Sequence, residues 1–349
     1  MKLLQYTYKL TDIPGRDDWI MDAIDLQELN LIVGKNASGK SRVLIVPTAF
    51  SEMITQYKPV LFGNWEFTFI TDDNRKIFYN VVNNKNTEIK EKLVVQEQIV
   101  LERKDGITNL YSETERVFEK ISPPDDKLAL HVRRDKKEYP FFENIVEWAE
   151  HTHAFKFGLV YSNMLLENII TADDIPTLIK ELDEGLKNNI IHKFNKLGYD
   201  IEKIYAKLAG EKEALYIKEK NLENDLIQSQ LSQGMFRALS LIVFIYYLIN
   251  KNKVRTIIVD DLCEGLDYDR ATKLGKLLFE ELQNRNIQFI ASSNDSFLMD
   301  VVNIKYWNIL ARRNNTIKVY NYKNSQEKFD QFKYSGLSNF DLFSSDYLE

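Results

Sequence analysis

A glycine-rich loop near the N-terminus carries the residue types that hold nucleotide phosphates. Residues 31–41, LIVGKNASGKS, fit the pattern G-x-x-x-x-G-K-[ST]. The glycines let the backbone curl so that N–H groups point at phosphate oxygens, and a following helix adds its positive end. Lys40 then neutralises the β- and γ-phosphates of ATP, and Ser41 ligates Mg²⁺. The predicted nucleotide-binding set is Gly34, Asn36, Ala37, Ser38, Gly39, Lys40, Ser41 and Arg42.

Two adjacent carboxylates follow an apolar segment near the C-terminus, in IIVDDLCEGLD, residues 257–267. A buried strand that ends in this way places Asp260 in the Mg²⁺ shell and Asp261 where it can activate water. Alone, such a pair is as consistent with carboxylates that cap a loop as with a catalytic site. Together with the phosphate loop, defined as residues 34–41, it indicates a nucleotide hydrolase.

The elements that must position these residues alternate in type. Strands are expected at 1–10 and 22–34, and a helix from Ser41. Apolar segments separated by polar turns at 64–113 predict an antiparallel meander, and SPPDD at 122–126 is a break. Helical spacing follows at 141–151 and 175–198, with Asp173 and Asp174 at the expected N-cap. A buried helix at 231–249, strands at 255–262 and 287–292, and an amphipathic stretch at 269–285 predict a largely parallel α/β sheet.

A third motif is LSQGMFR, Leu231–Arg237, called the signature segment below. In order and spacing, the phosphate loop, L-S-x-G-x-x-R, and D-D with a following G-L-D resemble the ATP-binding-cassette ATPases. Among these the chain is most similar to the SMC, RecF and OLD-like proteins. The resemblance covers the two ends of the chain only.

This resemblance implies an α/β P-loop ATPase head with an antiparallel β meander and an inserted small helical lobe. Sustained heptads are missing between Ser41 and Leu231, so no long coiled coil is expected. The predicted organisation is an N-terminal core part at 1–60, a β lobe at 61–121, a helical lobe at 122–222 and a C-terminal ATPase half at 223–349.

The resemblance also implies a head-to-head homodimer that sandwiches two ATP molecules. Ser232 and Gly234 of one subunit would contact the γ-phosphate held by Lys40 of the other, and Asp267 would link the two sites. The ordinary alternatives are an N-cap for Ser232, a turn for Gly234 and a solvated loop carboxylate for Asp267.

Two residues depart from the family pattern. Asp261 stands where the family usually has glutamate, and Glu264 is either a substitute base or a loop carboxylate. Asn294 stands where many relatives have histidine, so an amide that donates a hydrogen bond but does not titrate would face the γ-phosphate. Both changes predict slow hydrolysis in an ATPase that holds ATP as a switch.

Composition limits the partners. The chain of 349 residues carries a net charge of −6, so nucleic-acid binding would need a local patch, and no membrane partner is expected. The resemblance implies a separate effector protein, commonly in bacterial defence against phage, and the alternatives are a RecF-like DNA clamp or a scaffold that never hydrolyses ATP. The short apolar stretch 238–249 and the single cysteine, Cys263, favour the cytoplasm. Basic patches occur at Arg133, Arg134, Lys136, Lys137 and at Lys251, Lys253, Arg255.

Several residues stay open. His151 and His153 face one way on a strand, but without further ligands a metal pair is the weaker interpretation. The family has a glutamine that reports on Mg²⁺, and Gln56, Gln96 and Gln98 are all candidates for it here. The tail, with the aromatic residues Phe340, Phe343 and Tyr347, either packs on its own domain or docks an effector.

Overall fold

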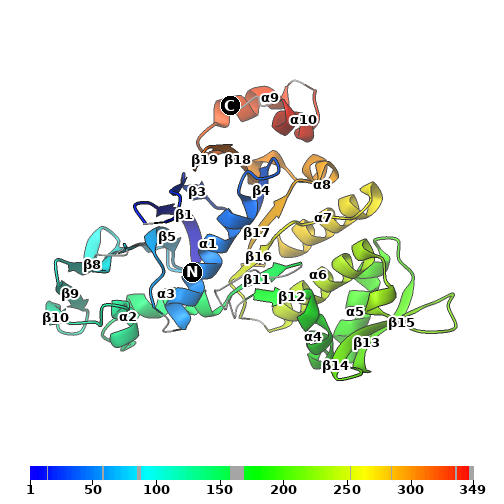
Figure 1. The fold of residues 1–349 in the computed structure, drawn as a ribbon, viewed down its shortest axis with the longest axis horizontal. Coiled ribbons are helices and arrows are strands. Elements are labelled where there is room, and N and C mark those ends of the chain that lie inside the picture. The colour runs from blue at the N-terminus through cyan, green and yellow to red at the C-terminus, as the bar shows by residue number, and fades with distance from the viewer. Residues whose placement is uncertain are drawn as a thin grey trace.

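A computed structural model describes residues 1–13, 15–56, 59–84, 88–157, 169–251, 253–283, 285–334 and 336–345. Within these residues most strands join one large mixed sheet, and a smaller three-stranded sheet lies apart from it (Figure 1). The tail residue Tyr347 lies outside the described residues.

The predicted parallel core is present. Its strands all run parallel and follow one another across the sheet as β12, β11, β16, β17, β4 and β18. Their carboxyl ends therefore meet at one edge, where the phosphate loop and the aspartate pair begin. The bounds are β12 (Ile169–Thr171), β11 (Thr152–Lys156), β16 (Thr256–Val259), β17 (Gln288–Ser293), β4 (Leu29–Gly34) and β18 (Trp307–Arg313).

Successive residues of these strands serve two different cores, because side chains alternate between the faces of a sheet. Leu31, Ile257 and Phe289 belong to one hydrophobic cluster, and their neighbours Ile32 and Ile258 belong to the other. Burial on both faces explains why the strands are continuously apolar in sequence.

Helices cover both faces (Figure 1). Helices α1 and α3 pack together on one side of β4, β17 and β16, and α6 and α7 lie on the other. By length and composition, α6 is the one helix in the described ranges that could cross a membrane, but 61% of it is buried, as in a core helix. The bounds are α1 (Lys40–Thr55), α2 (Ala129–Val132), α3 (Pro140–Glu150), α6 (Gln233–Asn250), α7 (Tyr268–Leu282) and α8 (Ser296–Val301).

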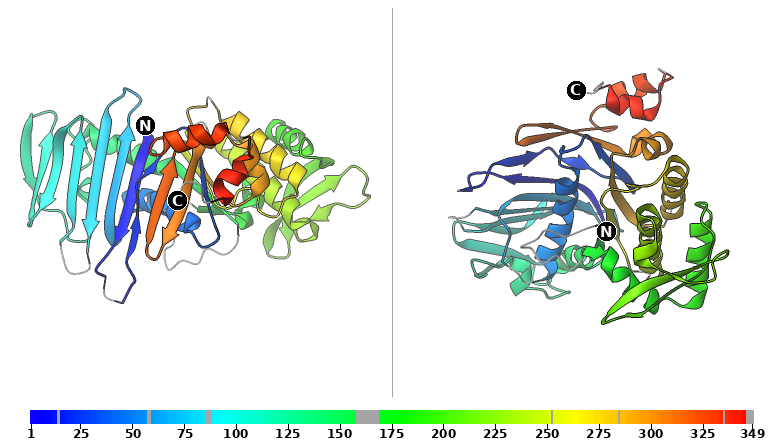
Figure 2. Two further views of the ribbon diagram at one scale, coloured as in Figure 1. Left: turned by 90° about the horizontal axis from the view of Figure 1, so that it is seen from above. Right: turned by 45° about the vertical axis from the view of Figure 1, so that its right-hand side comes forward.

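The predicted meander is also confirmed, and Figure 2 shows its strands side by side in the same sheet. β5 alternates buried and half-buried residues over its whole length, the pattern of a sheet with one covered face. Strands β1, β2 and β19 join the meander to the parallel core. The bounds are β1 (Lys2–Leu10), β2 (Trp19–Met21), β3 (Ile24–Asp25), β5 (Gly63–Ile70), β6 (Lys76–Asn83), β7 (Lys90–Val95), β8 (Gln98–Lys104), β9 (Ile107–Ser112), β10 (Val117–Ile121) and β19 (Thr316–Asn321).

The region 122–222 is less helical than its sequence suggested. The predicted helix 175–198 divides at Asp183, whose side chain caps the second helix by accepting from the Leu186 N–H at 2.8 Å. After it, a charged and aromatic stretch forms a hairpin instead of more helix, because its alternating apolar residues need only one covered face. The bounds are α4 (Ile175–Glu181), α5 (Glu184–Asn195), β13 (Ile201–Ala209), β14 (Lys212–Glu219) and β15 (Leu226–Ile227).

The described part of the tail forms two helices, α9 (Gln326–Lys333) and α10 (Asn339–Ser344). Leu342 is buried, and Phe340 and Phe343 pack against the core. The Phe340 N–H donates to Asp300 Oδ1 at 3.0 Å, at the end of α8. In these residues the tail therefore packs on its own domain.

A buried charged network joins the meander to α2. Glu91 accepts from Tyr79 Oη at 2.6 Å and from the Ala129 N–H at 2.9 Å, and Arg103 Nη1 lies 3.4 Å from it. Arg103 also donates to the Lys127 carbonyl at 2.7 Å. The network holds the segment around 127 against the sheet.

Glu91→Ala should destabilise the protein strongly, because it leaves the buried Arg103 without its carboxylate. The expected loss is about 3–5 kcal/mol in the free energy of unfolding, measured by urea denaturation. Glu102→Ala, at an exposed position of β8, is the control and should unfold like the parent. Equal midpoints for the two variants would show that the network contributes little.

Candidate nucleotide site

The phosphate loop has the geometry of an anion cradle. Ala37 and Gly39 adopt φ of 62° and 99°, which turns the chain sharply before α1. A Cβ at Gly34 would lie 2.3 Å from Ser38 Oγ, and one at Gly39 would lie 2.6 Å from Ile317 Cδ1. A side chain at either position would therefore displace a neighbouring side chain, and at Gly39 the positive φ favours glycine as well.

The helix that follows offers unused donors. Helix α1 begins at Lys40, and no side chain caps its first N–H groups. Ser38 Oγ is buried with no hydrogen-bond partner in the described ranges. A phosphate at this position would accept from both, so the residues present fit a nucleotide triphosphate. Ser41 and Arg42 lie exposed at the same end of the helix.

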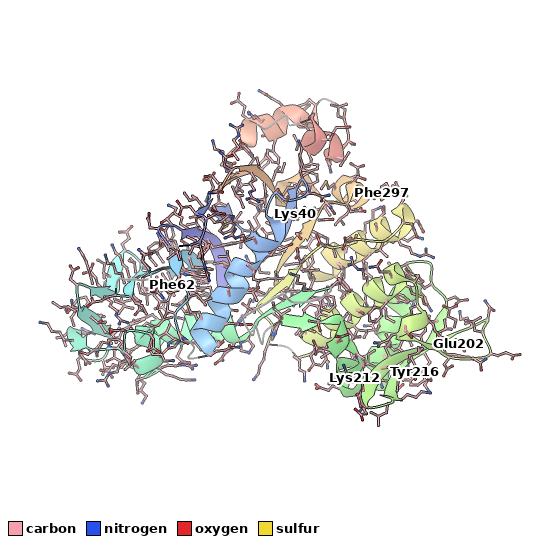
Figure 3. All side chains as sticks on the ribbon, in the orientation of Figure 1. Lys40, Phe62, Glu202, Lys212, Tyr216 and Phe297 are labelled. Atoms are coloured by element: carbon pink, nitrogen blue, oxygen red, sulfur yellow. The ribbon has the colours of Figure 1, made fainter. Side chains whose placement is uncertain are left out.

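Lys40 lies at the junction of β4 and α1 (Figure 3), folded back onto the loop. Its Nζ donates to the carbonyls of Gly34 at 2.8 Å and Lys35 at 3.4 Å. Burial lowers the pKa of Lys40, and the carboxylates of Asp261 and Asp260 oppose that shift. The predicted partners of the phosphate chemistry are thus electrostatically coupled.

The aspartate pair is held by one serine of the neighbouring strand β17. Ser292 Oγ donates to Asp260 Oδ1 at 2.6 Å and accepts from the Asp261 N–H at 2.9 Å. Asp261 adopts a φ of 53°, in the left-handed region. Burial raises the pKa of Asp261, and the charges of Asp260 and Glu264 raise it further, whereas Lys40 lowers it.

Asn294 connects the end of β17 to the phosphate loop. Its Nδ2 donates to Asn36 Oδ1 at 2.9 Å, and both residues are exposed. The amide that replaces the expected histidine therefore lies beside the loop. Its contact with a γ-phosphate stays a prediction.

The signature segment packs against the loop that follows the aspartate pair. Ser232 is the N-cap of α6 and accepts from the Met235 N–H at 3.2 Å. A Cβ at Gly234 would lie 2.6 Å from the Gly265 carbonyl oxygen, so glycine allows this approach. Arg237 forms an ion pair with Glu264, which engages the carboxylate considered above as a substitute base.

Asp267 is the N-cap of α7 rather than a free loop carboxylate. It accepts from the Arg270 N–H at 3.0 Å and pairs with the Arg270 guanidinium at 2.5 Å. The backbone hydrogen bond from Arg270 lowers the pKa of Asp267. The cap orients the chain between the aspartate pair and α7, and a role in linking two subunits stays a prediction.

Sequence reasoning missed two supports of the phosphate loop. Arg312, on β18, donates to the Ala37 carbonyl at 3.3 Å, and Ile317, on β19, packs over Gly39. Both reach the loop only because β18 pairs with β4, a contact that no local pattern records. Ser292 was visible as the polar end of an apolar strand.

The structure gives less support to the glutamines and histidines whose roles the sequence left open. Gln56 caps the far end of the 16-residue helix α1, roughly 24 Å from Lys40 by helix rise, and Gln96 and Gln98 lie at the β7–β8 turn. Burial lowers the pKa of His153 to about 4. No group of three or more metal-binding side chains of His, Cys, Asp or Glu occurs in the part of the chain that the structure describes.

Gly34→Ala should weaken ATP binding at least about ten-fold, because the added methyl displaces Ser38 and opens the cradle. Titration with a fluorescent ATP analogue measures this. Gly185→Ala in α5, a glycine of ordinary φ, is the matched control and should bind like the parent. Unchanged affinity in Gly34→Ala would mean that the loop does not hold the phosphates.

No family model and no curated protein matches the chain. Solved structures do. The SMC head domain from Thermotoga maritima matches at 13% identity and a TM-score of 0.50, over 92% of this chain and 99% of that one. An SMC head bound to the C-terminal winged-helix domain of ScpA matches at 12% identity and a TM-score of 0.53, over 94% and 100%. The chain therefore has the fold of SMC head domains, an ABC-type ATPase fold, and its described residues contain no long coiled coil.

Proposed function

We propose that the protein binds and hydrolyses ATP, dimerises around it and thereby regulates a partner effector. The observation that carries this proposal is the cradle of the phosphate loop, with its uncapped helix and buried Ser38 hydroxyl, facing the aspartate pair through Lys40. The positive groups of the cradle, Lys40 and the helix N-terminus, and the negative aspartate pair lie at one edge of the sheet. Transfer of a phosphoryl group depends on such positioning of charges around the phosphates.

The residues that would hold Mg²⁺ are Ser41 and Asp260, a hydroxyl and a carboxylate, which suit a hard cation. Bound Mg²⁺ would neutralise charge on the β- and γ-phosphates. Asp261 would accept the proton of the attacking water, and its raised pKa suits a base. Its side chain is one methylene shorter than glutamate, which is the reason to expect slow turnover.

Exposed groups beside the site support a second copy of the chain as partner. Ser232 is exposed at the start of α6. Tyr268 and Phe297, which follow Asp267 and Asn294, are 62% and 37% exposed and pack edge to face at 5.0 Å. Figure 3 shows Phe297 on α8, near the level of Lys40. Exposed aromatic pairs of this kind are typical of interfaces.

A protein effector is favoured over DNA as the partner, because ion pairs occupy cations in both basic patches, 133–137 and 251–255. Arg134 pairs with Glu143 at 2.5 Å and with Glu150 at 3.6 Å. Arg255 pairs with Glu147 at 2.8 Å. Carboxylates thus pair with Arg134 and Arg255, which reduces the free positive charge that a DNA clamp would use. One SMC head with this fold is bound to a domain of ScpA in its solved structure, so that head has a protein partner. From the resemblance to the OLD-like proteins, we extend the proposal to a role in bacterial anti-phage defence in the cytoplasm.

Light scattering should show a monomer with ADP and a dimer with ATP and Mg²⁺. Ser232→Arg should keep ATP binding and abolish the dimer, because the larger cation blocks the approach to the γ-phosphate of the other subunit. Ser325→Arg, at the N-cap of α9, serves as the control and should dimerise like the parent. A mass that ignores both nucleotide and Ser232→Arg would exclude the composite site.

Phosphate release should be slower than about one per second for the parent, faster for Asp261→Glu and absent for Asp261→Asn. Because the pKa of Asp261 is raised, the parent should lose activity as the pH falls at a higher pH than an ordinary aspartate allows. A pH profile of kcat checks this. Equal activity of the parent and Asp261→Asn would assign the base elsewhere, and no release from any variant would favour a non-hydrolysing scaffold.

A further inference from the structure

The hairpin β13–β14 presents an ordered row of cations and aromatics on one face. Tyr205 lies directly opposite Tyr216, and Lys203 directly opposite Lys218. Because opposite residues of an antiparallel pair share a face, and so do residues two apart, these side chains lie together. This Lys–Tyr face consists of Lys203, Tyr205, Lys207, Lys212, Tyr216 and Lys218.

The opposite face of the hairpin supplies the packing. Ile204, Leu215 and Ile217 are fully buried there, against α4 and α5. The three-stranded sheet lies at the outer end of the molecule (Figure 1), and in the described residues α4 and α5 are the α-helices that pack on its hairpin. The Lys–Tyr face is therefore not needed to close the core and is open to a ligand.

The two tyrosine rings form a platform. Their centroids are 5.5 Å apart and their planes differ by 13°. Tyr205 Oη donates to Asp225, which fixes that ring. Lys207 Nζ lies over the Tyr216 ring, 4.2 Å from its centre, as a cation–π contact, so a base that stacks on this ring takes the place of the lysine.

The lysines are poorly neutralised. Lys203 and Lys218 face each other across the strands, an arrangement of like charges that destabilises a sheet. Lys218 is held by the Leu222 and Glu223 carbonyls at 2.6 and 2.7 Å and lies 3.9 Å from Asp225. Within the described ranges, the ion pairs around the hairpin involve Lys180, Lys218 and Lys220 and not Lys203, Lys207 or Lys212. Residues 201–219 carry four lysines and four glutamates, so the hairpin is neutral as a whole, and its lysines are gathered on this one face.

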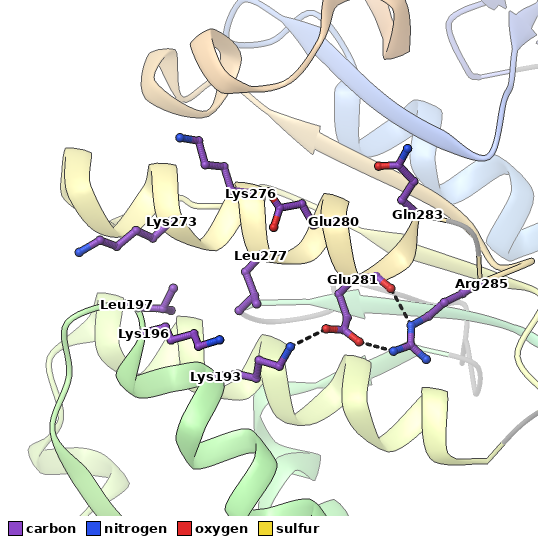
Figure 4. Close-up of a pocket in the computed structure, with 10 residues that line it drawn as sticks. All are labelled: Lys193, Lys196, Leu197, Lys273, Lys276, Leu277, Glu280, Glu281, Gln283 and Arg285. Carbon is purple, nitrogen blue, oxygen red and sulfur yellow. Dashed lines mark hydrogen bonds and ion pairs between the residues drawn. The ribbon is translucent and has the colours of Figure 1, made fainter.

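A second cationic surface, the groove of about 590 Å³ between α5 and α7, is different (Figure 4). There Glu281 pairs with Lys193 at 2.7 Å and also with Arg285. No aromatic side chain lines the groove in the described residues. Lys196 and Lys276 also line the groove, so what distinguishes it from the hairpin is the missing stacking surface and the carboxylates of Glu280 and Glu281 among its cations.

We infer that the Lys–Tyr face binds single-stranded nucleic acid. The lysines contact phosphates along the backbone, and two successive bases stack on Tyr205 and Tyr216. An unpaired strand is required because bases in a duplex are stacked on each other and cannot lie on a protein ring. The site is independent of the nucleotide site and goes beyond the proposed function.

The test is fluorescence anisotropy of the full-length protein with a labelled 12-nucleotide single-stranded DNA and RNA, over a salt series. Three or four phosphate contacts predict a slope of log K against log salt of about −2 to −3. Tyr216→Ala should weaken binding roughly 5- to 100-fold, and Tyr216→Phe should keep it, since stacking needs the ring alone. Lys203→Glu with Lys207→Glu should abolish it.

Controls separate this site from the others. Lys276→Ala, in the groove, and Lys40→Ala, in the phosphate loop, should bind the oligonucleotide like the parent, so a failed ATP site leaves the result intact. Circular dichroism checks that each variant folds. Equal binding of a duplex, or no loss in Tyr216→Ala, would overturn the inference. Displacement by poly-glutamate as efficient as by unlabelled oligonucleotide would also overturn it and assign the face to an acidic protein.

Discussion

The site depends on the parallel pairing of β17 with β4 on one side and β16 on the other. Val33 lies opposite Ser293, and Val259 lies opposite Ala291. Because all three strands point the same way, the phosphate loop, the aspartate pair and Asn294 emerge at one edge. No segment of the chain holds this arrangement by itself, since β4 and β17 are far apart in sequence.

Charge balance then sets the chemistry of that edge. Lys40 is buried, which disfavours its positive charge, and the aspartate pair is half-buried beside it, which disfavours the second negative charge. Each group makes the charge of the other less unfavourable. Ser292 fixes both aspartates through one hydroxyl, so the geometry of the pair is set by a single residue of the neighbouring strand.

Between β12 and the signature segment, the described residues form short helices and a hairpin instead of a long coiled coil. Helices α4 and α5 and the hairpin bury one apolar side against α6 and each other, and they form a compact lobe. The chain then passes through β15, which pairs with β14, and reaches Ser232. The signature segment therefore follows directly on the three-stranded sheet. The Lys–Tyr face on the outer side of that sheet serves solubility or the binding of a ligand, because folding does not depend on its charges.

The sequence alone determined the local chemistry. The phosphate loop, the aspartate pair and the meander depend on short-range patterns, namely glycine spacing, an apolar run that ends in carboxylates, and alternation with a period of two. The tertiary structure decided what long-range pairing controls. The caps at Asp183 and Asp267 are local hydrogen bonds to the N–H three residues on. Folding over a longer range instead paired Glu264 with Arg237 and brought Arg312 to the loop. A charged side chain takes its role from the partner that folding places beside it, and such partners leave no trace in a local pattern.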